Sequence, residues 1–155
     1  MTESFPAIDA TAVAQMSAAL PFVRALGAEV VSVTPGVGKM KLAWREDLVG
    51  DPRSGLLHGG VITTLLDNAS GMAVFSSLRE VMQIATLDLR IDYLRPPVPK
   101  QDIHAEATCY RMTRTIAFVR GRAYQEPGGD IAASLATFIL GSSGLRNASD
   151  RASAP

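Results

Sequence analysis

The sequence predicts an α+β fold in which an antiparallel sheet of five to six strands packs against one long central helix. The segment from Gly55 to Leu78 is apolar and of helical length, whereas the segments around it alternate apolar with polar residues. The strand-like segments after this helix follow one another through short turns, which favours antiparallel pairing. With 155 residues, 47% of them hydrophobic, the chain can bury the core of a single domain.

The N-terminal segment is expected to form a helix beside this domain. Ile8 to Leu20 carries helix-forming residues with apolar positions three and four apart, and Asp9 can cap its start. Pro21 then ends the helix or forces a turn. The chain therefore divides into a helical extension, a main domain and a flexible tail, at residues 1–25, 26–141 and 142–155.

Two strands and a loop are expected before the central helix. Gly27 to Arg45 shows strand alternation and a turn at Pro35 and Gly36, which predicts a hairpin. The following "REDLVGDPRSG" contains Pro and Gly, so an irregular polar loop is expected. After the helix come four further strand-like segments, Gln83–Leu94, Asp102–Met112, Thr115–Gln125 and Ile131–Leu140.

Charge and cysteine content narrow the possible partners and the compartment. Fifteen basic and fifteen acidic residues cancel, so no footprint for nucleic acid or an anionic membrane is expected. No apolar run approaches the ~20 residues of a membrane span, and the N-terminus does not resemble a signal peptide. The single Cys109 indicates a core thiol and a reducing compartment. We expect a soluble, cytoplasmic protein without a metal site, in which His104 is structural.

One charged side chain interrupts the central helix. Asp67 is the only formal charge between Arg53 and Arg79. A carboxylate among apolar residues must be hydrogen-bonded, neutralised or used, because burying it unpaired costs several kcal/mol or so. Two interpretations stay open, a catalytic base or nucleophile and a structural carboxylate. The structural one requires partners nearby in sequence, which Thr63, Thr64, Asn68 and Ser70 could supply.

The helix start offers unpaired backbone donors. His58, Gly59 and Gly60 stand where N–H groups have no intrahelical acceptor and the helix dipole is positive. Such N–H groups suit a carbonyl oxygen that becomes negative during reaction, although a tight turn is the alternative. Gly59 and Asp67 are about 12 Å apart along one helix, so they can serve one reaction only if they come from two chains. A central helix that is apolar on nearly every side also favours an obligate dimer.

The segment "LHGGVITTLLDNASGMA" closely resembles the motif of the hotdog-fold acyl-CoA thioesterases of the PaaI type, related to the 4-hydroxybenzoyl-CoA and acyl-CoA thioesterase 13 groups. The resemblance runs from about Leu26 to Leu140. It implies a hotdog fold, with the sheet wrapped around the helix, and hydrolysis of a medium-chain or aromatic acyl-CoA to free acid and CoA. It also implies no cofactor other than the coenzyme A of the substrate, and a homotetramer built as a dimer of dimers.

The resemblance assigns roles to the residues of the motif. Asp67 would be the catalytic acid, which activates water or attacks the thioester directly. Gly59 would polarise the thioester carbonyl through its N–H, Gly60 would let the chain turn, and His58 would orient rather than act as a base. Thr86 falls where related enzymes carry a Ser or Thr that helps to hold the water.

One loop departs from the family pattern. Similar enzymes place an Asn or Gln six or seven residues before the histidine, whereas this chain has Asp51 and Pro52. An aspartate cannot donate from an amide, so Asp51 takes an altered part or the site is weakened. If it were ionised close to Asp67, repulsion would raise one of the two pKa values.

The remaining expected contacts concern the substrate. Arg95, Arg111 and Arg114 are candidates for the phosphates of CoA, because arginine grips phosphate through two N–H groups. The alternative is that they are solvated surface residues. Asn68 and Met72 are expected to contact the substrate, Met72 together with Phe75 as part of an acyl pocket.

Two other functions are weighed against hydrolysis. A non-catalytic acyl-CoA-binding protein would use the same groove, and the departure at Asp51 and Pro52 leaves this alternative open. A hotdog hydratase or dehydratase would need an acid and a histidine facing the acyl chain. His58 precedes the helix and Asp67 lies two turns inside it, which is a poor arrangement for that chemistry.

Overall fold

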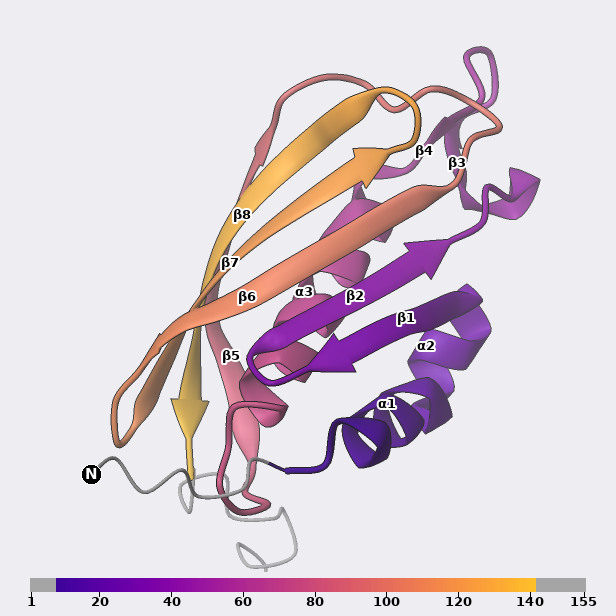
Figure 1. The fold of residues 1–155 in the computed structure, drawn as a ribbon. Helices are drawn as coiled ribbons and strands as arrows, with labels where there is room; N and C mark the ends of the chain where they lie inside the picture. The colour runs from indigo at the N-terminus through magenta and orange to yellow at the C-terminus, as the bar shows by residue number, and fades with distance from the viewer. Residues whose placement is uncertain (1–7, 142–155) are drawn as a thin grey trace, which may run out of the picture.

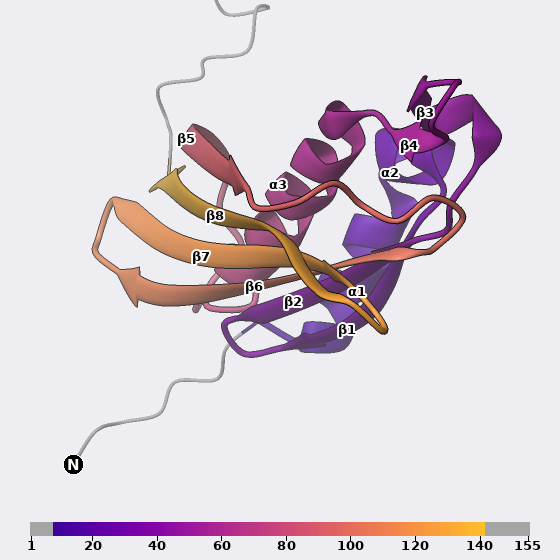
Figure 2. The same ribbon diagram turned by 90° about the horizontal axis from the view of Figure 1, so that it is seen from above.

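The computed structural model describes residues 8–141, in which a curved sheet wraps around one long helix (Figures 1 and 2). The helices are α1 (Ala10–Ala19), α2 (Pro21–Leu26) and α3 (Gly59–Phe75). The large sheet contains β1 (Ala28–Thr34), β2 (Val37–Leu42), β5 (Ile84–Tyr93), β6 (Ile103–Met112), β7 (Ile116–Gln125) and β8 (Gly129–Leu140). A small sheet pairs β3 (Val49–Asp51) with β4 (Leu56–Leu57). The predicted α+β architecture is confirmed.

The strand order of the large sheet is β1-β2-β6-β7-β8-β5, and every neighbouring pair is antiparallel. The expected succession holds for β6, β7 and β8 but is wrong for β5, which lies at the far edge beside β8 (Figure 1). The chain then crosses from β5 to β6 through residues 94–102, where three prolines prevent further strand pairing. β5 is held at the sheet edge by its pairing with β8, and it also contacts the central helix.

The N-terminal helix is divided in two by a break at Leu20. Asp9 caps α1 as predicted, since its carboxylate accepts a hydrogen bond from the Thr11 backbone N–H at 3.1 Å. Pro21 ends α1, as expected, but also begins α2 at a position where its missing N–H costs nothing. The expectation of one helix is therefore incomplete. Residues 1–7 and the expected tail from residue 142 lie outside the described residues.

Two segments before α3 reverse the chain direction, the β1–β2 hairpin and the β3–β4 hairpin. The hairpin at Pro35 and Gly36 is confirmed, and Gly36 adopts the positive φ of 77° that its turn requires. The loop after β2 was expected to be irregular, but it contains a 3₁₀ turn at Glu46–Leu48 and the hairpin β3–β4. Asp51 closes that hairpin, because its carbonyl oxygen accepts from the N–H of Ser54 and of Gly55.

The core lies between α3 and the inner face of the sheet. Ile62, Leu65 and Leu66 of α3 are almost completely buried. The sheet can approach the helix closely at Gly38 of β2, where a Cβ atom would lie 2.6 Å from the Ala69 carbonyl oxygen. No helix within residues 8–141 is long and apolar enough to cross a membrane.

The helix face toward α1, α2 and β5 is not apolar, which corrects one expectation. Thr64, Asp67, Asn68 and Gly71 lie on this face and are only half-buried. They are small or polar, spaced at three and four residues, so they form one stripe along α3. The expectation of a helix that is apolar on nearly every side is therefore wrong. In the sequence the stripe is hard to recognise, because buried apolar residues separate its members.

Candidate active site

The start of α3 leaves one backbone donor free. His58 is the N-cap, and its Nδ1 accepts a hydrogen bond from the Gly60 N–H at 3.0 Å. This hydrogen bond requires an unprotonated Nδ1, because a ring nitrogen that carries a proton cannot accept. Within residues 8–141 no atom accepts from the Gly59 N–H. The cap therefore uses the donor of Gly60 and leaves that of Gly59 available at the positive end of the helix.

Tyr93, at the end of β5, anchors this helix start. Its hydroxyl donates to the Gly59 carbonyl oxygen at 2.9 Å and lies 3.0 Å from the Thr63 hydroxyl. The ring leaves little room beside Gly59, since a Cβ atom there would lie 3.3 Å from the Tyr93 oxygen. Sequence reasoning did not assign Tyr93 a role. The available signal was its place near the end of the strand expected at Gln83–Leu94, seven residues after Thr86.

Asp67 receives its hydrogen bond from a residue distant in sequence. The Thr86 hydroxyl on β5 donates to Asp67 Oδ1 at 3.0 Å. Among the described residues no second donor reaches this carboxylate, so Oδ2 is free to bind a water molecule or a substrate. The structure thus brings together Asp67 and Thr86, two of the predicted site residues.

The polar residues close to Asp67 in sequence donate their hydrogen bonds elsewhere, not to its carboxylate. The Thr63 and Thr64 hydroxyls donate to the carbonyl oxygens of Gly59 and Gly60, one turn earlier. The Asn68 amide likewise donates to the Thr64 carbonyl oxygen at 2.9 Å. The Ser70 hydroxyl is buried without a partner among residues 8–141. The structural explanation that relied on these neighbours is therefore wrong.

A β-bulge orients Thr86. Thr86 pairs with Phe138 and Asp88 with Thr137, so Leu87 is an extra residue in β5. A bulge turns the side chains on either side of it relative to a regular strand. Leu87 is exposed as a consequence, on a strand whose outer edge is unpaired within the described chain.

Two cavities meet at Asp67. One, of about 320 Å³, lies between α1, α3, β5 and β8; the other, of about 520 Å³, lies between α2, α3 and β5. Asp67, Asn68 and Thr86 line both. Met72 lines the smaller cavity while being almost fully buried. The carboxylate is thus reachable from two sides, and both volumes are of the size that small-molecule ligands occupy.

The Asp51 carboxylate is hydrogen-bonded within the turn between β3 and β4. Its carboxylate accepts from the Arg53 backbone N–H at 3.1 Å and from the Ser54 hydroxyl at 3.0 Å. The Arg53 N–H, followed by the Ser54 hydroxyl and the Arg53 side chain, lowers the pKa of Asp51. This strand still borders the site, because a Cβ atom at neighbouring Gly50 would lie 2.9 Å from the Cα of His58.

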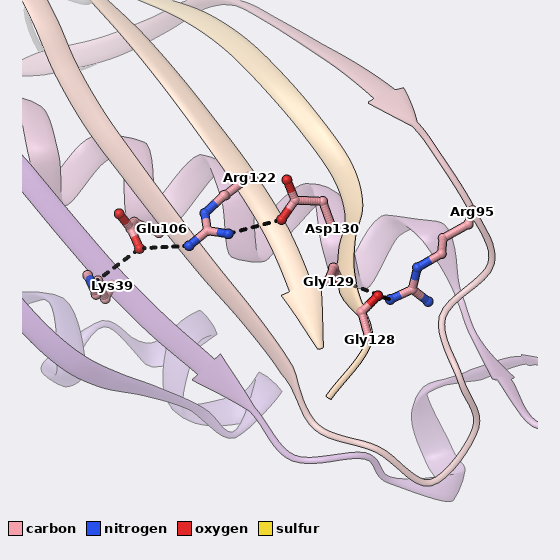
Figure 3. Close-up of polar contacts among 7 residues, drawn as sticks. All are labelled: Lys39, Arg95, Glu106, Arg122, Gly128, Gly129 and Asp130. Atoms are coloured by element: carbon pink, nitrogen blue, oxygen red, sulfur yellow. Dashed lines mark hydrogen bonds and ion pairs between the residues drawn. The ribbon is translucent and has the colours of Figure 1, made fainter. Parts of the chain in front are cut away.

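The three candidate arginines do not gather in one place. Arg95 donates to the carbonyl oxygens of Gly128 and Gly129 in the β7–β8 turn, at 2.8 and 2.9 Å (Figure 3). Arg95 also lines a third cavity, of about 410 Å³, together with Gly59. Arg111 and Arg114 are exposed at the β6–β7 turn, which is the opposite end of β7.

The ion pairs on the outer face of the sheet are separate from this site. Arg122 pairs with Glu106 and Asp130, and Glu106 also pairs with Lys39 (Figure 3). Each of these cations therefore already has a carboxylate partner.

The two residues expected to be structural have packing roles. The His104 ring stacks on Tyr124 with ring centroids 5.3 Å apart. Cys109 is half-buried, and burial raises the pKa of its thiol, which disfavours the reactive thiolate. Within residues 8–141 no cluster of His, Cys, Asp or Glu could hold a metal ion.

Sequence comparison finds relatives that are named as acyl-CoA thioesterases. An acyl-CoA thioesterase of Escherichia coli named for medium and long chains, YigI, is 30% identical over 79% of this chain and 86% of its own. Human acyl-coenzyme A thioesterase 13 is 31% identical over 66% of this chain and 72% of its own. A Halobacterium salinarum protein named as a putative esterase is 35% identical over 59% of this chain. The match spans only 61% of the length of that protein.

Solved structures of similar proteins superpose on the fold of this chain. A Pseudomonas aeruginosa protein that is 37% identical superposes with a TM-score of 0.72 over 82% of this chain and 95% of its own. A mutant of the phenylacetic acid degradation protein PaaI from Thermus thermophilus is 28% identical, with a TM-score of 0.69 over 77% of this chain and 98% of its own. The thioesterase superfamily model matches residues 54–132, which include α3 and β5. The predicted relationship is confirmed, and the chain belongs to the thioesterase superfamily of hotdog proteins.

Proposed function

We propose that the protein hydrolyses the thioester of a medium-chain or aromatic acyl-CoA, releasing the free acid and coenzyme A. The observation that carries this proposal is the Asp67 carboxylate, oriented by Thr86 and open to two cavities. The names of two relatives, YigI and acyl-coenzyme A thioesterase 13, support the substrate class. The name of the first includes medium chains.

Asp67 starts the reaction in either of two ways. As a general base, its free oxygen takes a proton from water, whose oxygen attacks the thioester carbon. The resulting tetrahedral intermediate expels the CoA sulfur, which leaves as thiol after taking a proton. As a nucleophile, the same oxygen attacks the thioester carbon, and the C–S bond breaks so that CoA leaves as a thiolate, which takes a proton from water. A second water molecule then hydrolyses the mixed anhydride, which releases the acid and regenerates the Asp67 carboxylate. In both routes Thr86 keeps the second carboxylate oxygen occupied, so the free one points to the substrate.

Gly59 of a second chain stabilises the negative charge that develops on the carbonyl oxygen. Its N–H has no acceptor among residues 8–141, and the dipole of α3 adds positive potential at that point. Gly59 and Asp67 of one chain are separated by about 12 Å of the same helix, because both belong to α3. The functional unit is therefore a homodimer with two antiparallel copies of α3, which pairs further into a tetramer.

The CoA moiety extends away from this thioester. Arg95 shares a cavity with Gly59, so it contacts the CoA phosphates on that side. Arg111 and Arg114 are exposed and supply cations at the other end of the sheet, where a neighbouring subunit can present them. His58 and Asp51 act on the substrate only by shaping the helix start and the adjacent turn.

The test is the release of CoA thiol from a panel of acyl-CoA thioesters by the wild type, Asp67→Asn and Asp67→Ala. Both variants should lose about 1,000-fold or more in kcat/KM, as expected for loss of a group that performs the chemistry. Unchanged hydrolysis without the carboxylate would show that Asp67 is not catalytic.

A non-catalytic acyl-CoA-binding protein is the second candidate. The use of the Asp51 carboxylate by its own turn favours it, because similar enzymes carry an amide at this position. Such a protein would bind acyl-CoA in titration calorimetry and release no thiol from any member of the panel.

A further inference from the structure

The smaller cavity beside Asp67 is polar at one end and mostly apolar along the rest of its wall. Asp67, Asn68 and Thr86 form the polar end. Gly71 and Phe75 follow on the same face of α3, one and two turns beyond Asp67. The cavity therefore runs along the helix for about 12 Å from the carboxylate. An apolar channel that begins at the proposed catalytic group suits the hydrocarbon part of an acyl chain.

The opposite wall of this cavity comes from the N-terminal helix α1 and from Leu20, the residue that follows it. Met16 and Leu20 line the cavity and are 42% and 45% exposed. Large apolar side chains that remain this exposed beside a cavity form a surface suited to an apolar ligand. Figure 1 shows α1 packed beside the sheet edge formed by β1, close to the C-terminal part of α3. α1 thus closes a chamber that the sheet and α3 leave open.

Gly71 has no packing reason to be glycine within the described chain. A Cβ atom at this position would meet no atom within 4 Å, whereas one at Gly38 would lie 2.6 Å from a backbone oxygen. Glycine inside a helix is less stable than alanine, so its presence here calls for another explanation. The missing side chain leaves room in the cavity one turn beyond Asp67.

We propose that Gly71, together with Met16 and Leu20, determines the length of the acyl chain that the active site accepts. The acyl chain extends from Asp67 past Gly71 toward Phe75, beneath α1. This inference rests on the proposed function, since it concerns the acyl end of the same substrate. It assigns α1 to the substrate pocket rather than to a structural extension.

The test compares kcat/KM over saturated acyl-CoA thioesters of increasing length for the wild type, Gly71→Ala and Gly71→Leu. Gly71→Leu should lower the ratio of long-chain to short-chain kcat/KM at least tenfold, because each methylene excluded from an apolar pocket costs about tenfold or more. Gly71→Ala should lower the ratio less, and its melting temperature should not fall, since alanine favours the helix.

Truncation of the opposite wall should act in the other direction. Met16→Ala and Leu20→Ala should raise the ratio of long-chain to short-chain kcat/KM by enlarging the cavity. Val81→Ala is the matched control, because Val81 is an apolar residue that is 80% exposed and lies outside this cavity. It should leave the ratio unchanged.

Two readouts separate failure of this inference from failure of the proposed function. If the wild type hydrolyses acyl-CoA but Gly71→Leu keeps the wild-type length profile, the inference is wrong and the function stands. If the wild type hydrolyses none, the Kd of the same thioesters tests the inference alone, and Gly71→Leu should weaken only the longer ones. If Gly71→Leu loses the oligomeric state of the wild type, then Gly71 is needed for close packing of helices between chains. That result would overturn the inference.

Discussion

At the scale of single residues, the site depends on a pair that no local pattern connects. Asp67 lies on α3 and Thr86 on β5, and they meet through one hydrogen bond of 3.0 Å. The isolation of Asp67 could be read from the sequence, because it is the only charge in a long apolar segment. Thr86 was identified only through resemblance to the family. Its contact with Asp67 requires the position of β5 relative to α3, which periodicity does not specify.

Thr86 should act as a positioning residue. Thr86→Val keeps the shape of the side chain but removes the donor to Asp67, so kcat should fall about 10- to 100-fold, as expected for a hydrogen bond to a charged group. KM should change much less. Thr86→Ser keeps the hydroxyl and should recover most of kcat, which a purely structural defect would not allow. An equal loss in both variants would contradict the role of the hydroxyl.

At the scale of elements, the central helix and most strands could be predicted because their apolar residues follow clear periods. Periodicity also misled on α3, where small and polar residues form a stripe along the face toward α1, α2 and β5. The place of β5 at the sheet edge and its bulge at Leu87 were not predictable, because strand pairing depends on contacts distant in sequence. Tyr93 was missed for the same reason.

The hairpin β3–β4 should carry a small acid-sensitive contribution to stability. The pKa of Asp51 is lowered in the folded protein, chiefly by the Arg53 N–H. Its ionised form therefore stabilises the fold above the unfolded pKa of about 4, and this contribution is lost as the pH falls through the folded value. Asp51→Asn keeps an acceptor for the turn but does not titrate.

Thermal unfolding at pH 7 and at pH 3.5 measures this effect. The melting temperature of the wild type should fall more than that of Asp51→Asn between the two conditions. A variant that loses as much stability as the wild type would show that the Asp51 carboxylate is not stabilised by its turn.

At the scale of the whole molecule, each proposed active site needs residues from two chains. The distance along α3 could be predicted from the sequence, since it follows from the helix rise and the spacing of Gly59 and Asp67. Within residues 8–141 the Gly59 N–H has no acceptor, and Asp67 lines two cavities. The unpaired edge of β5 and exposed Leu87 provide further surface for a second copy.

Two variants remove one half of the proposed site each. Asp67→Asn removes the acid, and Gly59→Pro removes the N–H donor. Proline is tolerated at the first position of a helix, and the φ of −61° and ψ of 135° at His58 suit a residue that precedes proline. Gly59→Ala is the matched control, because it adds a Cβ atom beside Tyr93 but keeps the N–H.

The most direct measurement is the activity of dimers that combine one Asp67→Asn chain with one Gly59→Pro chain. Each variant alone should be nearly inactive, whereas Gly59→Ala should retain more activity than Gly59→Pro. In a mixed dimer one site carries both lesions and the other carries none, so a statistical mixture should regain about a quarter of the wild-type activity. If mixed dimers verified by native mass spectrometry stay as inactive as their parents, Asp67 and Gly59 do not act together in a site shared by two chains.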